Sequence, residues 1–406
     1  MKSEIYREID FTKMSFNWGR LKVVSLVFFL IGAEAFAYQL FAGDAQRAWS
    51  AYLTNYVYWT GLAFGTFLLS PVLVLTNATW GRPVKRLSES VIFFLPFTFI
   101  LLWPLFLARG SVFWWVLHPE AQKAPWLNTP FFFARESIGL LALICAAALL
   151  AYNSVKSDLE YLEKVPSPEG RQSAQQALST AYVILYAFVM TLVAFDMMMS
   201  LNPEWFSTLF GAYYFAVSFY AGLALLAVLS TFGVKKLGMG NAIEKKQFHD
   251  IGKLTFAFCV VGLDFFYVQF LVIWYGNLPD ETRYVIWRVI YDPWAALAWT
   301  VLIVLFLIPF IVLVFRKIKL EPVRLTMISI WILIGVWLEK FLLVTPSIVK
   351  SKSLPLGIFE VLITIGWLGL FAFCVCSFLQ KYPVLAVSDP KLALALEPEA
   401  NVIDLA

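Results

Sequence analysis

Six carboxylates lie inside long apolar segments of this chain, where a lipid bilayer would make a charged side chain costly. They are Glu34, Glu136, Asp196, Asp264, Glu339 and Glu360. Two basic residues, Arg135 and Lys340, lie among them. A carboxyl without a partner in a medium of low dielectric constant favours its protonated form, so acids at such positions can bind and release protons. Their chemistry points to proton transfer or to the binding of a polar ligand within a membrane.

The segments that hold these acids are long enough to cross a bilayer, because a hydrocarbon core of about 30 Å needs about 20 apolar residues in a helix. Hydrophobic residues make up 61% of the chain and charged residues 14%, which excludes an ordinary water-soluble domain. We therefore predict an all-α polytopic membrane protein, a single membrane domain over residues 1–406 with ten transmembrane helices. Their apolar segments are 21–42, 52–75, 89–109, 131–151, 178–200, 206–231, 251–276, 292–316, 322–345 and 354–379.

The distribution of basic residues predicts the orientation of these helices. Lysine and arginine are concentrated in the segments that share a side with the N terminus, whereas the loops of the opposite side contain Arg47, Arg109, Lys123, Arg283, Arg288, Lys350 and Lys352. Cytoplasmic loops carry the excess of basic residues, so both termini should be cytoplasmic, with residues 380–406 as a cytoplasmic tail. The first apolar segment is too long for a signal-peptide core, and we expect a retained helix. The net charge of +4 follows from this asymmetry and implies no nucleic-acid partner.

The sequence also contains signs of an internal repeat of four helices. Asp196 and Glu339 each precede a proline by seven residues, and each pair closes a helix that runs toward the outer side. The second outer loop of each repeat also has a proline next to acidic residues. We predict a first four-helix unit over residues 52–200 and a second over residues 206–345, with the first and tenth helices outside them.

Few residues in the chain could hold a redox cofactor. His118 and His249 are expected on opposite sides of the membrane, so they cannot share a haem. The cysteines lack the spacing of a zinc or iron–sulfur site, and we expect small core residues at Cys145, Cys259, Cys374 and Cys376. We therefore predict no metal site, no haem and no iron–sulfur cluster in this chain. Any electrons that it handles must travel on a diffusible organic molecule.

The positions of the acids along their helices predict their depth, at a rise of about 1.5 Å per residue. Glu34 and Asp264 fall near the midplane of the bilayer. The other four acids fall in its outer third, together with Arg135 and Lys340. Adjacent residues on a helix point about 100° apart, so we expect that Arg135 cannot neutralise Glu136 and that Lys340 cannot neutralise Glu339. Each of these residues should therefore need a partner on another helix.

Three segments of the chain resemble the NrfD/PsrC-like membrane subunits, which interact with quinones in iron–sulfur molybdoenzyme-type complexes. These segments close the seventh, ninth and fifth helices and comprise Gln269–Thr282, Gly335–Ser347 and Phe195–Trp205. Within that family the chain is most similar to the ten-helix subunits of alternative complex III, a quinol:cytochrome c oxidoreductase. The outer loop with His118-Pro119-Glu120 and the segment Trp126–Arg135 are also similar to theirs. Its motifs combine features of the two related membrane subunits of that complex.

The resemblance implies a subunit without a redox metal, in a bacterial cytoplasmic membrane, that binds menaquinone or ubiquinone near the outer membrane surface. It implies electron exchange with an iron–sulfur subunit, with a multihaem cytochrome c or a molybdopterin-type subunit on the outer face. Other membrane subunits would complete the complex, and the chain alone would not be an enzyme. The family architecture of two four-helix bundles agrees with the predicted repeat.

Oxidation of a quinol releases two protons, so bases must accept them close to the ring. We predict Asp264 and Glu339 as the catalytic proton acceptors, with Asp196 as their counterpart in the first unit. Hydrogen bonds to the quinone, or its orientation, are expected from His118, Arg135, Tyr267 and Gln269. A proton path would use the acids Glu34, Glu89, Glu136 and Glu360.

Two other functions stay open on the sequence alone. A secondary transporter also has repeats and buried carboxylates, but it needs helices interrupted by glycine and proline at corresponding places near the midplane. Here the prolines lie mainly at helix ends, with Pro71, Pro96 and Pro309 as the nearest exceptions. A structural anchor for peripheral redox subunits predicts that the outer acids can be neutralised without loss of activity. The direction of electron flow is not encoded in a recognisable pattern.

Overall fold

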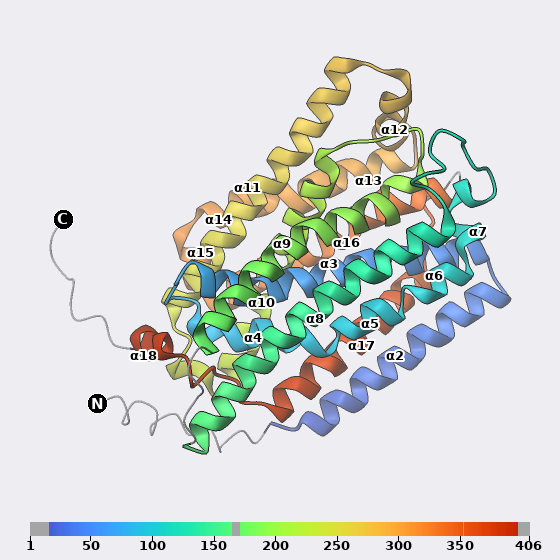
Figure 1. Cartoon of the computed structure of the whole chain (residues 1–406). Helices are drawn as coiled ribbons and strands as arrows, with labels where there is room; N and C mark the ends of the chain where they lie inside the picture. Colours follow the sequence, from blue (N-terminus) through green and yellow to red (C-terminus); the bar gives the residue numbers. More distant parts are fainter. Residues whose placement is uncertain (1–15, 165–170, 352, 397–406) are drawn as a thin grey trace.

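The computed structural model describes residues 16–164, 171–351 and 353–396. Within these residues the secondary structure is helical, with no β-strand. Ten segments are long and apolar enough to cross a bilayer, and they run side by side in one bundle (Figure 1). The prediction of an all-α polytopic membrane protein is therefore confirmed.

Eight of the ten segments are continuous α-helices. They are α2 (Trp18–Phe41), α3 (Ala45–Leu75), α8 (Thr129–Leu162), α9 (Arg171–Met197), α10 (Leu209–Lys236), α11 (Lys245–Gly276), α16 (Pro322–Ile348) and α17 (Ile358–Lys381). The third span is composed of η1 (Arg82–Val84), α4 (Lys85–Glu89), η2 (Ser90–Phe93), α5 (Leu95–Ile100) and α6 (Trp103–Leu107). The eighth is composed of α13 (Trp294–Val301), the π-helical η6 (Leu302–Leu307) and α14 (Ile308–Val314). Short helices lie between the spans: α7 (Arg109–Val112), η3 (Trp114–Val116), η4 (Met199–Leu201), η5 (Met239–Asn241), α12 (Pro279–Val289), α15 (Arg316–Leu320) and α18 (Pro390–Leu396).

The middle of the bundle is the crossing of α3 and α10 (Figure 1). Two glycines meet there, since a Cβ atom on Gly65 would lie 2.1 Å from the carbonyl oxygen of Ser218. A Cβ atom on Gly222 would lie 2.5 Å from the carbonyl carbon of Gly65. Lipid tails are as apolar as leucine, so helices in a membrane associate through such close backbone packing rather than through hydrophobic burial. The two glycines therefore fix how closely α3 and α10 approach.

The packing around this crossing is reciprocal. The helix α3 packs against α9 and also against α16, while α10 packs against α16 and also against α9. Two related units that face each other would exchange contacts in this way. The division into units 52–200 and 206–345 agrees with this pattern and stays a prediction. The helices α2 and α17 pack closely on each other beside the bundle, where Gly32 meets Gly366.

Prolines explain the two irregular spans. Three prolines, each without an amide hydrogen, interrupt the third span. In the eighth span, Pro309 cannot donate to the carbonyl of Leu305, and the hydroxyl of Tyr220 donates to that carbonyl at 3.3 Å instead. The thiol of Cys259 contacts the next carbonyl, that of Phe306, at 3.6 Å. The neighbouring helices thus satisfy backbone groups that the irregular turn leaves free.

The segment after α17 folds back onto the bundle and places α18 at the same end as the beginning of α2 (Figure 1). Its apolar residues before Ser388 are buried. The backbone amide and the hydroxyl of Ser388 donate to Asp158 of α8 at 2.8 and 2.6 Å. Asp389 accepts from Arg82 at 2.6 Å and lies 3.5 Å from Lys85. The predicted cytoplasmic tail is therefore anchored to the helices over its described part.

The contact of Gly65 with α10 should make this position intolerant of any side chain. Replacing glycine with alanine inside a helix adds about 1 kcal/mol of intrinsic helix stability. We nevertheless expect Gly65→Ala to lower the melting temperature and the yield of monodisperse protein, because its methyl group would overlap the backbone of α10. Gly139→Ala is the control, since its Cβ would make only ordinary contacts, the nearest at 3.4 Å from Val189. Equal melting temperatures for both variants would contradict the described crossing.

Asp389 should anchor the tail in a pH-dependent way. Burial raises the pKa of this carboxyl, but the neighbouring Lys85 and Arg82 together bring it below its usual value. A lowered pKa stabilises the folded state above the unfolded pKa of about 4, and this stabilisation is lost as the pH falls through the lowered value. We expect Asp389→Asn to speed hydrogen–deuterium exchange of residues 384–396 at pH 7, with the difference from wild type shrinking below about pH 4 and vanishing as the pH falls through the lowered native pKa. Equal exchange of both proteins at pH 7 would contradict the anchoring role.

Candidate functional site

A cavity of about 110 Å³ lies between α10, α11, α12, the eighth span and α16. An engineered protein cavity of about 150 Å³ takes up a benzene ring, so this space is smaller than a site for one ring and would have to widen to hold a ring. Most of its wall is apolar. Its polar side chains are those of Trp205, Tyr213, Gln269, Tyr284, Arg288 and Glu339.

Several buried polar atoms in this wall have no hydrogen-bond partner within the chain. They are Nε1 of Trp205, the hydroxyl of Tyr284 and both carboxylate oxygens of Glu339. A buried polar group left unpaired costs about 1–3 kcal/mol, and native proteins keep few of them. The indole and the phenol are hydrogen-bond donors, and a carboxylate is an acceptor. The side chains that line the cavity therefore include two donors and one acceptor that make no hydrogen bond within the chain.

Lys340 lies beside Glu339, with its Nζ atom 2.7 Å from Oε2 of the carboxylate. The prediction that these adjacent residues cannot neutralise each other is therefore wrong. The two side chains diverge at Cβ, but the flexible four-carbon stem of lysine can turn back toward its neighbour. The angles do not suit a hydrogen bond, so the carboxylate keeps its capacity to accept one from elsewhere. The Lys340 ammonium also lies 4.7 Å from the ring centre of Tyr214, a favourable cation–π distance.

A stack of three side chains closes the cavity toward α12, at the end of the bundle that the sequence predicts to be outer. The ring of Tyr284 lies parallel to that of Trp205, with 3.9 Å between their centres, and the guanidinium of Arg288 lies 3.6 Å from the Tyr284 ring centre. Arg288 also donates to two carbonyls at the end of α16, at 3.3 and 3.1 Å, and to Ser347 at 2.8 Å. Burial raises the pKa of the Tyr284 hydroxyl, so it stays a proton-bearing donor at neutral pH. The same three side chains line a surface groove of about 530 Å³ on the other side of the stack.

The first predicted unit contains a buried ion pair at the comparable place. Arg135 binds Asp196 of α9 through two hydrogen bonds of 2.6 Å each, and both side chains are buried. Arg135 also donates to the carbonyl of Trp126 at 2.7 Å, with its guanidinium 4.0 Å from the centre of that ring. The expectation that Arg135 pairs with an acid of another helix is confirmed. Its hydrogen bonds are thus directed to the protein's own groups.

Buried tyrosines at the α3–α10 crossing connect the two units. Tyr214 of α10 lies within electrostatic range of both Glu136 and Glu339, and its hydroxyl donates to the carbonyl of Val57 in α3 at 2.7 Å. Tyr56 of α3 lies near Glu136 and Tyr214. The hydroxyl of Tyr56 and both oxygens of Glu136 are buried without hydrogen-bond partners. A row of buried polar side chains therefore crosses the bundle from one unit to the other.

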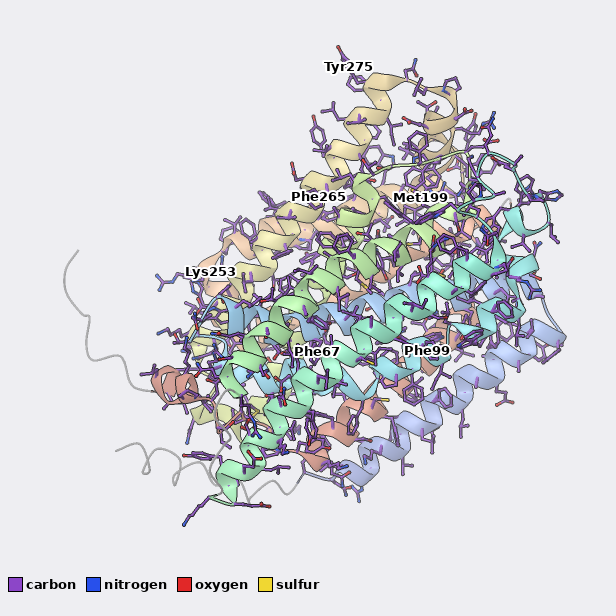
Figure 2. All side chains as sticks on the ribbon, in the orientation of Figure 1. Phe67, Phe99, Met199, Lys253, Phe265 and Tyr275 are labelled. Carbon is purple, nitrogen blue, oxygen red and sulfur yellow. The ribbon has the colours of Figure 1, made fainter. Side chains whose placement is uncertain are left out.

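The motif at the end of α11 contributes one predicted residue to the cavity. Gln269 lines it, and its amide oxygen accepts from Ser207 at 3.3 Å. Asp264 and Tyr267 lie on the exposed side of α11, which projects from the bundle toward Tyr275 (Figure 2). A difference of two residues turns a helix by about 200°, so Tyr267 and Gln269 cannot share a face. The structure thus keeps Asp264 away from Glu339.

The other predicted residues lie at separate places. His118 is exposed in the loop between η3 and α8, and Glu34 is exposed on α2. Glu89 is buried at the opposite end of the bundle in contact with Arg86. Glu360 begins α17, where Arg47 donates to both of its oxygens at 2.8 and 2.9 Å. The structure therefore places none of these four in the wall of the cavity, and their role in quinone binding or a proton path stays a prediction.

Sequence reasoning missed Trp205, Tyr284 and Arg288 as site residues. In the sequence, Trp205 appears only as the last residue of a helix-closing segment, and Arg288 only as a charge in a predicted outer loop. Tyr284 and Arg288 lie four residues apart, and so on one face of α12. An amphipathic helix after a predicted quinone motif is the signal that could have found them.

Cysteines and potential metal ligands form no cluster in the part of the chain that is described. Cys259, Cys374 and Cys376 are buried, Cys145 is exposed, and all four are free thiols. Among the described residues, no three histidines, cysteines or acids are grouped closely enough to hold a metal ion.

Comparison with known proteins gives this chain no family. It matches no protein-family model, and no curated protein matches it. The resemblance to NrfD/PsrC-like subunits therefore rests on the three helix-closing segments and the outer-loop motifs alone.

Proposed function

We propose that this protein is the quinone-binding membrane subunit of a respiratory electron-transfer complex, and that the cavity at Glu339 holds the quinone ring. One observation carries this proposal. An apolar cavity is lined by Trp205, Tyr284 and Glu339, whose buried polar atoms make no hydrogen bond within the chain, although Glu339 is ion-paired with Lys340. A quinone is an apolar ring with an oxygen at each end, and it would pair these atoms.

The polar atoms of the cavity suit both redox forms of such a ligand. The oxygens of a quinone accept hydrogen bonds, which Trp205 and Tyr284 can donate. A quinol donates hydrogen bonds and, on oxidation, loses two electrons and two protons. Glu339 is then the proton acceptor next to the ring, and Lys340 and Tyr214 lie beside it on the way to Glu136. Glu339 must pass the first proton on before it can accept the second.

The ligand would enter from the bilayer. Phe266 and Phe270 line the cavity, and each is 40% exposed on α11. Across from them the π-helical turn of the eighth span contributes Leu302 and Phe306. Single π-helical turns are frequent at functional sites, and here the turn widens a helix between the cavity and lipid. An isoprenoid tail could lie in this opening while the ring occupies the cavity.

Electrons would leave toward the outer side, where the resemblance implies an iron–sulfur subunit with a multihaem cytochrome c or a molybdopterin-type subunit. The groove of about 530 Å³ shares Trp205, Tyr284 and Arg288 with the cavity, so a partner in the groove would lie one layer of side chains from the ring. The excess of basic residues supports a cytoplasmic location for both termini. Other membrane subunits would complete the complex in a bacterial cytoplasmic membrane.

A secondary transporter receives less support. Its broken helices should occupy corresponding places in the two repeats. The irregular spans here are the third and the eighth, which are the second helix of one predicted unit and the third helix of the other. A purely structural anchor would have no need of a cavity with unpaired donors.

Removing the hydroxyl of Tyr284 tests the binding of quinone directly. Tyr284→Phe keeps the stack on Trp205 but removes one donor, so we expect roughly 3- to 10-fold weaker binding of a short-chain menaquinone analogue, the equivalent of one hydrogen bond. Quenching of tryptophan fluorescence measures this affinity in detergent. Tyr275→Phe is the matched control, because this tyrosine is 88% exposed on α11 and should leave the affinity unchanged. Equal affinities of both variants would reject the cavity as the site.

Glu339 and Asp264 separate the proposed proton acceptor from an exposed acid. In the assembled complex, Glu339→Gln should lower quinone-linked turnover by about 10²-fold or more, the usual contribution of a general base. Asp264→Asn should retain most of the turnover, since its side chain lies outside the cavity. A large loss of turnover in Asp264→Asn with a small loss in Glu339→Gln would instead assign the proton acceptor to the exposed face of α11.

A further inference from the structure

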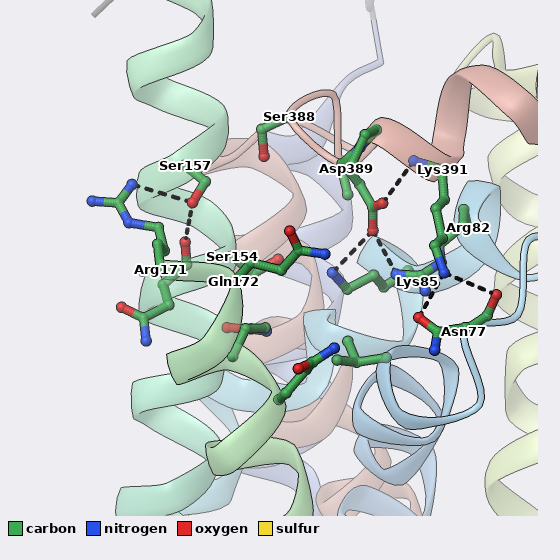
Figure 3. A pocket seen from close by; sticks show the side chains of 16 residues that line it. Asn77, Arg82, Lys85, Ser154, Ser157, Arg171, Gln172, Ser388, Asp389 and Lys391 are labelled. Atoms are coloured by element: carbon green, nitrogen blue, oxygen red, sulfur yellow. Dashed lines mark hydrogen bonds and ion pairs between the residues drawn. The ribbon is translucent and has the colours of Figure 1, made fainter. Parts of the chain in front are cut away.

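A second polar cavity, of about 400 Å³, lies at the opposite end of the bundle from Glu339. Its walls come from the ends of α3 and α8, the beginnings of the third span and of α9, and the anchored tail. Figure 3 shows Arg171 and Ser157 on one side of it, and Lys85, Asp389 and Lys391 on the other. None of these residues belongs to the proposed quinone site.

Cations outnumber acids in the wall of this cavity. Arg82, Lys85, Arg171 and Lys391 line it, against the single carboxylate of Asp389. Two further acids lie nearby: Glu160 pairs with Arg171 of this wall and offsets its charge, and Asp158 pairs with Arg86. The cations Arg82, Lys85 and Lys391 still outnumber Asp389. The wall itself therefore attracts an anion.

Hydrogen-bond donors in the wall are also free to bind a ligand. Both the nitrogen and the oxygen of the Gln175 side-chain amide are buried and have no hydrogen-bond partner. The ammonium of Lys85 lies 3.5 Å from Asp389 and 4.0 Å from Glu89, distances that leave at least one of its three hydrogens unused. An anion between these two side chains would accept hydrogen bonds from the Gln175 amide nitrogen and from the Lys85 ammonium.

The cavity lies at the depth of lipid headgroups. The apolar segments of α3, α8 and α9 end or begin within two turns of Asn77, Ser157 and Gln175, which line the cavity. The polar headgroup layer adds only about 5–8 Å to each side of the hydrocarbon core, about one helical turn and a half. The anions most abundant at this level are the phosphate groups of lipids.

We propose that this cavity binds the phosphate group of an anionic phospholipid headgroup. Basic pockets between transmembrane helices bind anionic headgroups in this manner, through charge and hydrogen bonds to the phosphate oxygens. Gln175 and Lys85 donate to the phosphate, and Arg171 and Lys391 contribute charge at its edge. The lipid would then also stabilise the position of the segment after α17, because Ser388 and Asp389 form part of the same wall. Free phosphate shares this chemistry, and the experiment must distinguish it from a lipid.

Native mass spectrometry of the purified full chain in detergent measures this binding. Wild-type protein titrated with phosphatidylglycerol should retain one molecule with about tenfold higher affinity than for phosphatidylcholine, a difference of about 1.4 kcal/mol. Gln175→Leu with Arg171→Gln should remove that preference. Lys235→Gln with Lys236→Gln is the matched control, since these exposed lysines lie at the same end of the bundle and outside the cavity. Excess inorganic phosphate should not displace the lipid.

Two outcomes would overturn the proposal. Equal retention of phosphatidylglycerol by wild type, the cavity variant and the control would show that the cavity holds no lipid headgroup. Complete displacement by inorganic phosphate would assign the cavity to a soluble anion. Lys391→Gln provides a second variant at the edge of the cavity, should the first pair fold poorly, and it should weaken binding in the same direction. Because the readout needs no quinone, its result is independent of the function proposed for the Glu339 cavity.

Discussion

The backbone contact of α3 with α10 at Gly65 and Gly222 is the constraint on which the rest of this structure depends. A membrane offers helices little hydrophobic gain from association, so close packing and polar contacts must hold them together. The crossing brings Tyr56 and Tyr214 between the buried acids of the two units. It also fixes α16 against both units, and α16 carries Glu339 into the wall of the cavity.

Buried carboxylates in this protein differ in how they are paired with a neighbouring cation. In the first predicted unit, Arg135 donates a hydrogen bond to each carboxylate oxygen of Asp196. This pairing leaves the carboxylate less able to bind a ligand. In the second unit, Glu339 has a cation close by but no hydrogen bond, and its neighbours Trp205 and Tyr284 also leave polar atoms unpaired. Unpaired buried groups lower stability, and they occur at Glu136 and Tyr56 as well as at Glu339; those at Glu339 belong to side chains that line a cavity, where a ligand can pair with them.

The sequence predicts the helix class and the ten spans, because apolar length is a local property, while the depth of the acids in the bilayer stays a prediction. It predicts Glu339 and Gln269 as site residues, and both line the cavity. It does not predict which face of an apolar helix is buried, and Asp264 and Tyr267 accordingly lie on the exposed side of α11. Nor does it predict Arg288, whose place in the site depends on how α12 packs against the end of α16. The sequence also does not predict the pairing of Lys340 with Glu339. The 100° rotation between adjacent residues of a helix fixes where their side chains start, but the flexible lysine side chain can turn back toward its neighbour.

The most direct measurement is photo-crosslinking of the purified protein with a menaquinone analogue that carries its photoreactive group on the ring, followed by mapping of the labelled peptides. The proposed function predicts labels on the peptides that contain Trp205, Tyr284 and Glu339, and their loss when unlabelled menaquinone competes. Competable labels confined to the exposed face of α11 around Asp264, or to the first unit around Arg135, would contradict a quinone site in the Glu339 cavity.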